Sequence, residues 1–333
     1  MTTFQVVAVR GPLDESVHHV SVAVADAEGR LVAQARTPEL VTFWRSAAKP
    51  FQLWPLVAGG GIARFGLDPE MLALACGSHN AEPIHRTVGQ RWLDLVGLEE
   101  ADLSCGGHAS LSARVAEQMV RDGIVPTELW SNCSGKHAAL LALARLHGWP
   151  TAGYEAIGHP VQDEVARSFA HWSGVPVPAL HWGVDGCTAA AVAMPLAATA
   201  TAWARLGTTD DAAMATIRAA MHAHPEMVAG TDRLDTTVMQ AWPGRVLAKI
   251  GAEGVYGASL PTLGLGVALK VEDGDLKVAG YALMAVLEAL TARFDRQGAW
   301  PTDTLARWRM PTIKNTRGVA TGQWALRGAL TFA

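Results

Sequence analysis

Segments of alternating polar and apolar residues at both ends of the chain constrain its fold most strongly. Residues 17–24 and 31–35 flank a short turn, and residues 265–271 and 276–280 flank another. Both patterns are typical of β-hairpins. A helix is expected directly after the second hairpin, over residues 281–296, where the apolar residues take helical spacing.

The chain between these ends has mainly helical periodicity. Helices are predicted over residues 71–76, 87–96, 111–121, 134–146, 160–172 and 212–223. Because strands at opposite chain ends need partners, the economical arrangement joins both ends in one antiparallel sheet. We therefore expect an α+β fold, with helices flanking this sheet and a mainly helical lobe inserted. The expected α/β lobe comprises residues 1–60 and 240–333, and the helical lobe residues 61–239, within one catalytic unit, 1–333.

The composition excludes several classes of partner. The 333 residues carry a formal net charge of −4, and no cluster of Lys and Arg indicates nucleic acid or an anionic membrane surface. A small molecule is the expected partner. Four cysteines lie apart without a C-x-x-C pair, and the first residues do not resemble a secretory signal, so we expect a cytoplasmic protein with reduced thiols. The most apolar segment, residues 187–206, contains Pro195 and Arg205, which favours a buried helix over a membrane span.

Lysine is scarce, which draws attention to its positions. The 27 basic residues comprise six lysines and 21 arginines. Only lysine can act as a base, because a guanidinium stays charged at ordinary pH. Ser46 and Lys49 form a Ser-x-x-Lys pattern before a helix-like stretch, residues 51–57. If Ser46 opens that helix, the amine can reach the hydroxyl; alternatively Ser46 is an N-cap and Lys49 is solvated. Lys249, between apolar residues, is either buried and functional or directed outward from a strand.

Other polar segments lie where turns are expected. Residues 75–85 are rich in Gly, Ser, His and Asn, which suits either close approach of a ligand or a capped turn. Cys133 and Lys136 lie one turn apart, a weak metal signal because lysine is an uncommon ligand. Cys187 precedes the apolar segment and is either a ligand or an inert core residue. Residues 230–236 form a charged loop.

Five motifs, in this order, resemble the rhizobial-type L-asparaginases, also called class 3 or the asparaginase II family. The motifs are RSAAKP (45–50), CGSHNAE (76–82), NCSGKH (132–137), DGC (185–187) and KIGAEG (249–254). The resemblance covers the whole chain. Members of this family share the fold of serine β-lactamases and glutaminases, so the resemblance implies that fold.

The resemblance implies an enzyme that hydrolyses L-asparagine to L-aspartate and ammonia through an acyl-enzyme. Two Ser-Lys tandems, Ser46 with Lys49 and Ser78 with Lys249, would form one active site. Ser46 is the expected nucleophile, and Lys49 would take its proton. The second tandem would assist by proton relay.

The resemblance also implies a metal site, a substrate site and a homodimer. The metal, usually zinc, would tune substrate binding without acting as the catalytic Lewis acid, and its ligands would be Cys133, Lys136 and Cys187. The family positions that line or support the pocket are Arg45, His79, Asn80, Glu82 and Asp185. The charged loop adds the candidates Thr231, Asp232 and Arg233, and residues 106–108 are another lining segment. The substrate α-carboxylate calls for Arg45 or Arg233, and the α-ammonium for Glu82 or Asp232.

Two alternatives remain open. A related serine amidohydrolase acting on glutamine or a β-lactam would use the same Ser-x-x-Lys pattern, although the β-lactamase companions Ser-Asp-Asn and Lys-Thr-Gly are absent. The second alternative is a non-catalytic protein on this fold that binds a metal or an amino acid. Retention of both Ser-Lys pairs weighs against that alternative.

Overall fold

The computed structural model describes residues 3–295 and 301–333. The chain forms two compact units. The first, called the sheet unit, contains the chain up to Thr42, Met194–Thr208 and Thr237–Ala333. The second, called the helical unit, contains Phe43–Ala193 and Thr209–Thr236.

These units divide the chain differently from the expected boundary at residue 60. Helix α1 (Lys49–Ala58) belongs to the helical unit, because it packs against α6 (Ser134–His147), α7 (Pro160–Ser173) and α9 (Ala212–Ala223). The Ser-x-x-Lys motif therefore lies in the helical unit and not in the lobe that holds the sheet.

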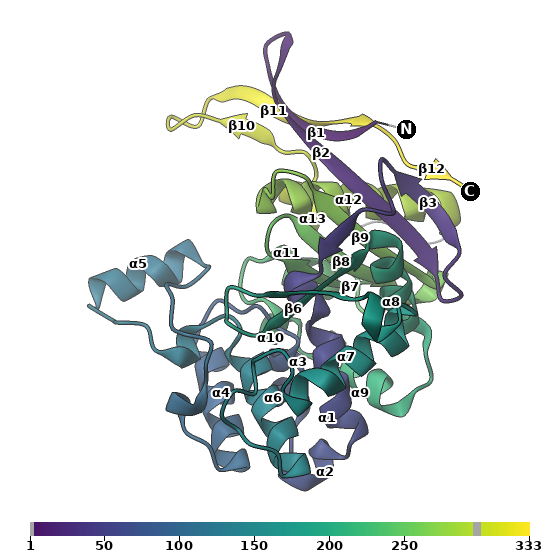
Figure 1. The fold of residues 1–333 in the computed structure, drawn as a ribbon. Helices are drawn as coiled ribbons and strands as arrows, with labels where there is room; N and C mark the ends of the chain where they lie inside the picture. Colours follow the sequence, from purple (N-terminus) through teal and green to yellow (C-terminus); the bar gives the residue numbers. More distant parts are fainter. Residues whose placement is uncertain (1–2, 296–300) are drawn as a thin grey trace. The chain divides into compact units, whose positions relative to one another are not determined.

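The main sheet joins both ends of the chain, as Figure 1 shows for β1, β2 and β11. Its path is β10-β11-β1-β2-β9-β8-β7, and β3 pairs with β2 and β12. Neighbouring strands pair antiparallel, and the expected α+β fold with a sheet from both chain ends is confirmed. The strands are β1 (Phe4–Arg10), β2 (Leu13–Asp26), β3 (Leu31–Ala35), β7 (Leu247–Gly251), β8 (Val255–Leu260), β9 (Leu265–Val271), β10 (Thr312–Lys314), β11 (Ala320–Gly328) and β12 (Thr331–Phe332).

Helix α8 (Leu196–Thr208) packs closely on this sheet. It contacts β2, β8 and β9, partly through small buried residues, namely Ala23, Ala25, Ala200 and Ala268. Gly266 permits the approach, because a Cβ at this position would overlap the Ala200 carbonyl oxygen. This packing places α8 in the sheet unit, although the sequence predicted that it lies in the helical lobe.

The predicted second hairpin is wrong. Residues 276–280 form the first turns of α12 (Leu276–Phe294), and β9 pairs with β2 and β8 instead. The Asp275 carboxylate accepts a 2.9 Å hydrogen bond from the Val278 N–H and so caps the helix. The helix predicted over residues 281–296 therefore begins earlier, and Arg296 lies outside the described residues.

The buried helix predicted over residues 187–206 is only partly correct. Strand β6 (Ala190–Pro195) comes first, pairs antiparallel with β5 (His181–Val184), and is followed by α8 from Leu196 onward. Pro195 lacks an N–H and stands at the junction of strand and helix. Across the described ranges, no helix has the length and hydropathy needed to cross a membrane.

The helices predicted between the chain ends are confirmed. Helix α6 is buried from Ser134 to Ala144 and packs against α1, α3 (Pro69–Ala75), α4 (Pro83–Val96) and α7. Gly135 lets it pass α3 closely, since a Cβ there would lie 2.6 Å from the Leu74 carbonyl oxygen. The other short elements are β4 (Val41–Phe43), α2 (Gly61–Phe65), α3 (Pro69–Ala75), α4 (Pro83–Val96), α5 (Ala113–Arg121), α10 (Pro225–Val228), α11 (Leu234–Ala241) and α13 (Thr302–Leu305).

Candidate active site

The Lys49 amine is the centre of a buried polar cluster in the helical unit. Lys49 is only 1% exposed and lies at the first position of α1. Its Nζ donates 3.1 Å hydrogen bonds to Ser78 Oγ and to the Asn132 carbonyl oxygen, and another hydrogen bond to the Gly77 carbonyl oxygen. An ammonium has three protons, so these acceptors use all of them. Lys49 thus connects three of the sequence motifs.

Ser46 lies in a 3₁₀ turn, Arg45–Ala48, ahead of α1 and does not open the helix itself. Ser46 is half-buried, whereas Ser78 is buried and only 3% exposed. The Lys49 backbone N–H donates to the Ser46 carbonyl oxygen, but among the described residues no side-chain hydrogen bond joins the Ser46 hydroxyl to the Lys49 amine. The alternative of a solvated Lys49 is excluded by its burial, and the serine hydroxyl that Lys49 contacts is Ser78.

Lys249 lies on β7 of the sheet unit and is fully buried. Its Nζ donates a 2.6 Å hydrogen bond to the Ile250 carbonyl oxygen. An outward, solvated lysine is therefore excluded. Ser78 belongs to the helical unit, and the pairing of Lys249 with Ser78 stays a prediction.

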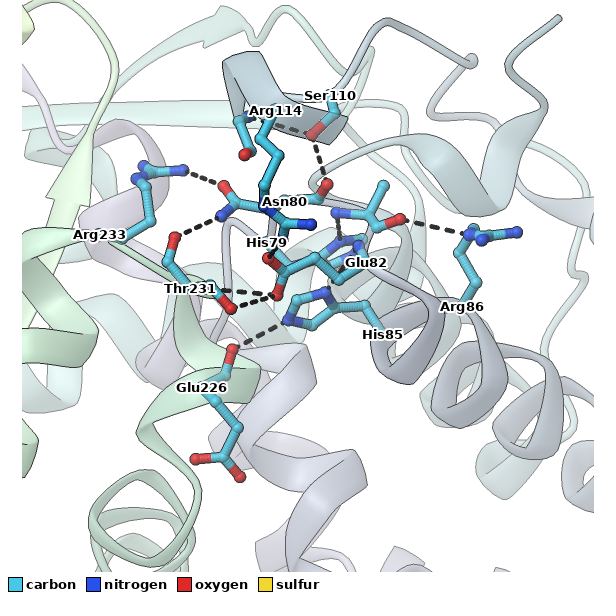
Figure 2. A network of polar contacts seen from close by, with 12 residues as sticks. His79, Asn80, Glu82, His85, Arg86, Ser110, Arg114, Glu226, Thr231 and Arg233 are labelled. Carbon is cyan, nitrogen blue, oxygen red and sulfur yellow. Dashed lines mark hydrogen bonds and ion pairs between the residues drawn. The ribbon is translucent and has the colours of Figure 1, made fainter. Parts of the chain in front are cut away.

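Four of the expected substrate residues form one hydrogen-bonded network, shown in Figure 2. Glu82 Oε2 accepts 3.2 Å bonds from both the N–H and the hydroxyl of Thr231, and Glu82 Oε1 pairs with Arg114 at 3.1 Å. Asn80 donates to the Thr231 carbonyl oxygen at 3.0 Å and accepts from Arg233 at 2.9 Å. The charged loop thus meets the CGSHNAE motif. Asp232, the neighbour of Thr231 in this loop, is exposed and has a positive φ of 64°.

His79 is held neutral inside the same motif. Its Nδ1 accepts from the Ala81 N–H at 3.1 Å, so Nε2 carries the proton and donates to Ser134 Oγ at 2.9 Å. Burial holds the pKa of His79 well below its usual value, and the positive charge of Lys49 acts in the same direction. The His79 ring stacks on His85, which donates to the Glu226 carbonyl oxygen. His79 is therefore a hydrogen-bond donor here and not a charged group.

Arg45 and Asp185 form an ion pair. The Arg45 Nε and Nη2 atoms lie 2.9 and 2.8 Å from Asp185 Oδ1. Burial alone would raise the pKa of Asp185, but Lys136 and Arg45 outweigh it and lower the pKa. Both expected substrate residues are thus charged and already in contact with each other.

The three expected metal ligands gather in the helical unit. Cys133, Lys136 and Cys187 are all buried, and Lys136 Nζ lies 2.8 Å from Cys187 Sγ. A hydrogen bond from Cys187, helped by Lys49 and Lys136, lowers the pKa of Cys133 well below that of a free thiol. Within the described residues, no group of three or more His, Cys, Asp or Glu could hold a metal. Two thiols and one amine in contact still fit a thiophilic ion such as zinc, provided that Lys136 loses its proton.

The sequence interpretation missed several residues of this cluster. Asn132 and Ser134 lie inside a motif that was identified, but only the structure shows their bonds to Lys49 and His79. His108, from the proposed lining segment 106–108, accepts a 2.9 Å hydrogen bond from the Asn132 N–H. Arg114 had no sequence signal, because it resembles any arginine on an amphipathic surface helix.

Comparisons with known proteins identify the family. The family model for L-asparaginase II matches residues 6–326. No curated protein matches the chain significantly. Similar solved structures include a putative β-lactamase from Bacteroides dorei DSM 17855, with 12% identity over 80% of this chain and 92% of that chain (TM-score 0.42). A mutant simvastatin synthase from Aspergillus terreus has 13% identity over 84% and 91% of the two chains (TM-score 0.45). A β-lactamase from Mycobacterium bovis has 13% identity over 83% and 94% (TM-score 0.36). On the match of nearly its whole length to the family model, the chain belongs to the L-asparaginase II family, and is an amidohydrolase.

Proposed function

We propose that this protein is an L-asparaginase that hydrolyses L-asparagine to L-aspartate and ammonia through a serine acyl-enzyme. The observation that carries the proposal is the buried Lys49 amine, which lies 3.1 Å from a serine hydroxyl. That serine is Ser78, and a lysine amine can take a proton from a nucleophilic serine through such a second hydroxyl. Family membership favours the side-chain amide of asparagine as the substrate group.

We propose different roles for the two serines. Ser46 is half-buried and stands on the turn before Lys49, whereas Ser78 is buried and contacts the amine. In the proposal Lys49 first gives up one proton and acts as a neutral amine. The Ser46 oxygen then attacks the side-chain amide carbon, and its proton passes to Lys49 with Ser78 as a relay. The C–N bond then breaks, ammonia leaves with a proton, and water hydrolyses the β-aspartyl ester to release aspartate and the Ser46 hydroxyl. Lys249 is proposed as the partner of Ser78, because the family resemblance implies this pair.

Substrate recognition is proposed to use charged groups of the same unit. Glu82 is 7% exposed and ionisable, whereas Asp232 is exposed, so Glu82 suits a desolvated contact with the α-ammonium better. The α-carboxylate would bind Arg45 or Arg233. Asp185 would hold Arg45 in place, and His79, Asn80 and Thr231 would support these groups.

A zinc ion is proposed as the cofactor, with Cys133, Lys136 and Cys187 as the residues that would hold it. When bound, it would supply a positive charge that tunes substrate binding. The two thiols and the amine already lie in contact, which supports this assignment. Metal analysis of the purified protein tests it, and a lack of zinc together with an unchanged KM in Cys133→Ser would remove it. A homodimer and a cytoplasmic location stay predictions, which sedimentation and fractionation check.

The decisive assay compares ammonia release from L-asparagine and from L-glutamine with ring opening of a β-lactam. We expect asparagine to give the highest kcat/KM, with activity lost in Ser46→Ala and Lys49→Met. A preference for glutamine or for the β-lactam would favour the related serine hydrolases. Absence of turnover on all three substrates, with both variants identical to the parent, would favour a non-catalytic binding protein.

A further inference from the structure

We infer that Arg114, on the surface helix α5, positions the Glu82 carboxylate for the α-ammonium group of the substrate. The inference rests on the proposed function, because it takes Glu82 as the group that binds this ammonium. Arg114 itself would not touch the substrate. It would act through Glu82 and is therefore a positioning residue.

The first support is the ion pair that links a surface cation to a buried anion. Arg114 Nη2 lies 3.1 Å from Glu82 Oε1, and both side chains are drawn in Figure 2. The Arg114 side chain is 69% exposed, whereas that of Glu82 is 9% exposed. Across the described ranges, Arg114 is the one cation that forms an ion pair with Glu82. A buried carboxylate is unfavourable without a partner, so this contact helps to hold the Glu82 side chain in place.

The second support is the set of donors that surround the Glu82 carboxylate. An ionised carboxylate has about four lone-pair sites, two on each oxygen. The Thr231 N–H and hydroxyl use both sites of Oε2, and Arg114 uses one site of Oε1. Glu82 also forms the capping box of α4, in which its side chain accepts from the His85 N–H. Arg114 is the charged member of the donors that fix the direction of this carboxylate.

The third support is the way in which α5 is fastened to the site. Ser110, just ahead of α5, donates a hydrogen bond to the Asn80 carbonyl oxygen. Val115 and Met119 of α5 pack against Ala81, which has a positive φ of 53°. Together with Arg114, these contacts hold the inner side of α5 against residues 80–82. The helix is thus attached to the segment that carries Glu82, and Arg114 adds the charged contact.

Steady-state kinetics of three variants test the inference. The variants are Arg114→Gln, Arg114→Lys and the matched control Arg121→Gln. Arg121 lies on the same helix, is 67% exposed and pairs with Glu117. We expect Arg114→Gln to raise KM for L-asparagine about tenfold with little change in kcat. Arg114→Lys should restore most of the affinity, and Arg121→Gln should match the parent. Succinamate, which lacks the α-amino group, should show the same KM in all four proteins. An unchanged KM for asparagine in Arg114→Gln, or an equal rise for both substrates, would overturn the inference.

Amide hydrogen exchange gives a readout that does not depend on turnover. The Thr231 N–H donates a hydrogen bond to the Glu82 carboxylate. If Arg114 orders Glu82, this amide should exchange faster in Arg114→Gln than in Arg121→Gln. Unchanged exchange would refute the positioning role even in an active enzyme. If the parent released no ammonia from asparagine, the proposed function would fail, whereas faster exchange at Thr231 would still support the contact of Arg114 with Glu82.

Discussion

Replacing Lys49 by Met should abolish activity while leaving the protein folded. Methionine is close to lysine in length and fills the buried space without the amine. The Gly77 and Asn132 carbonyl oxygens would lose a donor, and each buried unpaired acceptor costs about 1–3 kcal/mol. Removing a cation that is 1% exposed relieves a desolvation cost of several kcal/mol, which offsets this loss. The free energy of unfolding should therefore change by less than about 3 kcal/mol.

The rate should change far more. A positioned general base contributes on the order of 10²–10⁴ to the rate, which corresponds to about 3–5 kcal/mol of the barrier. Ammonia release measured by a coupled assay gives kcat/KM, and urea unfolding gives stability. Lys314→Met, at an exposed position of β10, is the control and should behave as the parent. A folded Lys49→Met protein with kcat/KM within tenfold of the parent would refute the assignment of Lys49 as the base.

Three further predictions concern stability, each measured by urea unfolding. Asp275→Ala removes the N-cap of α12 and should cost about 1 kcal/mol; no change would mean that the 2.9 Å bond to Val278 contributes little. Gly135→Ala should cost about 1–3 kcal/mol through overlap with Leu74, which exceeds the gain of about 1 kcal/mol in helix propensity; a more stable variant would contradict the close packing of α6 on α3. The folded pKa of Asp185 is lowered, so its carboxylate stabilises the fold above its unfolded pKa of about 4 and loses this effect as pH falls. The parent should therefore exceed Asp185→Asn in stability at pH 7 by a margin that shrinks below about pH 4, and a margin independent of pH would contradict this.

The architecture could be predicted because strand pairing at the chain ends has a strong sequence pattern. The prediction of a second hairpin was wrong at residues 276–280, because a short alternating segment is also compatible with a helix. The capping side chain of Asp275 and the long apolar continuation decide for the helix. The prediction of a buried helix over residues 187–206 was partly wrong for a related reason, since a short apolar strand and a buried helix look alike in sequence.

The candidate site could be predicted by residue type but not by partner. The motifs identified Ser46, Lys49 and Ser78 as chemical groups, whereas the hydrogen bond from Lys49 to Ser78 depends on how α1 meets the loop after α3. Arg114 was not predictable, because a surface arginine becomes part of the site only through the packing of α5 on Ala81. Residues that are far apart in sequence meet through tertiary packing, and a local pattern does not contain this information.

Trapping the covalent intermediate tests the proposed mechanism most directly. The enzyme would be mixed with L-asparagine, quenched in acid within the turnover time, digested and analysed by mass spectrometry. We predict a β-aspartyl ester on the peptide that contains Ser46, absent in Ser46→Ala and not formed in Lys49→Met. Ammonia release with no adduct on any serine, or with the adduct on Ser78, would contradict the assignment of Ser46 as the nucleophile.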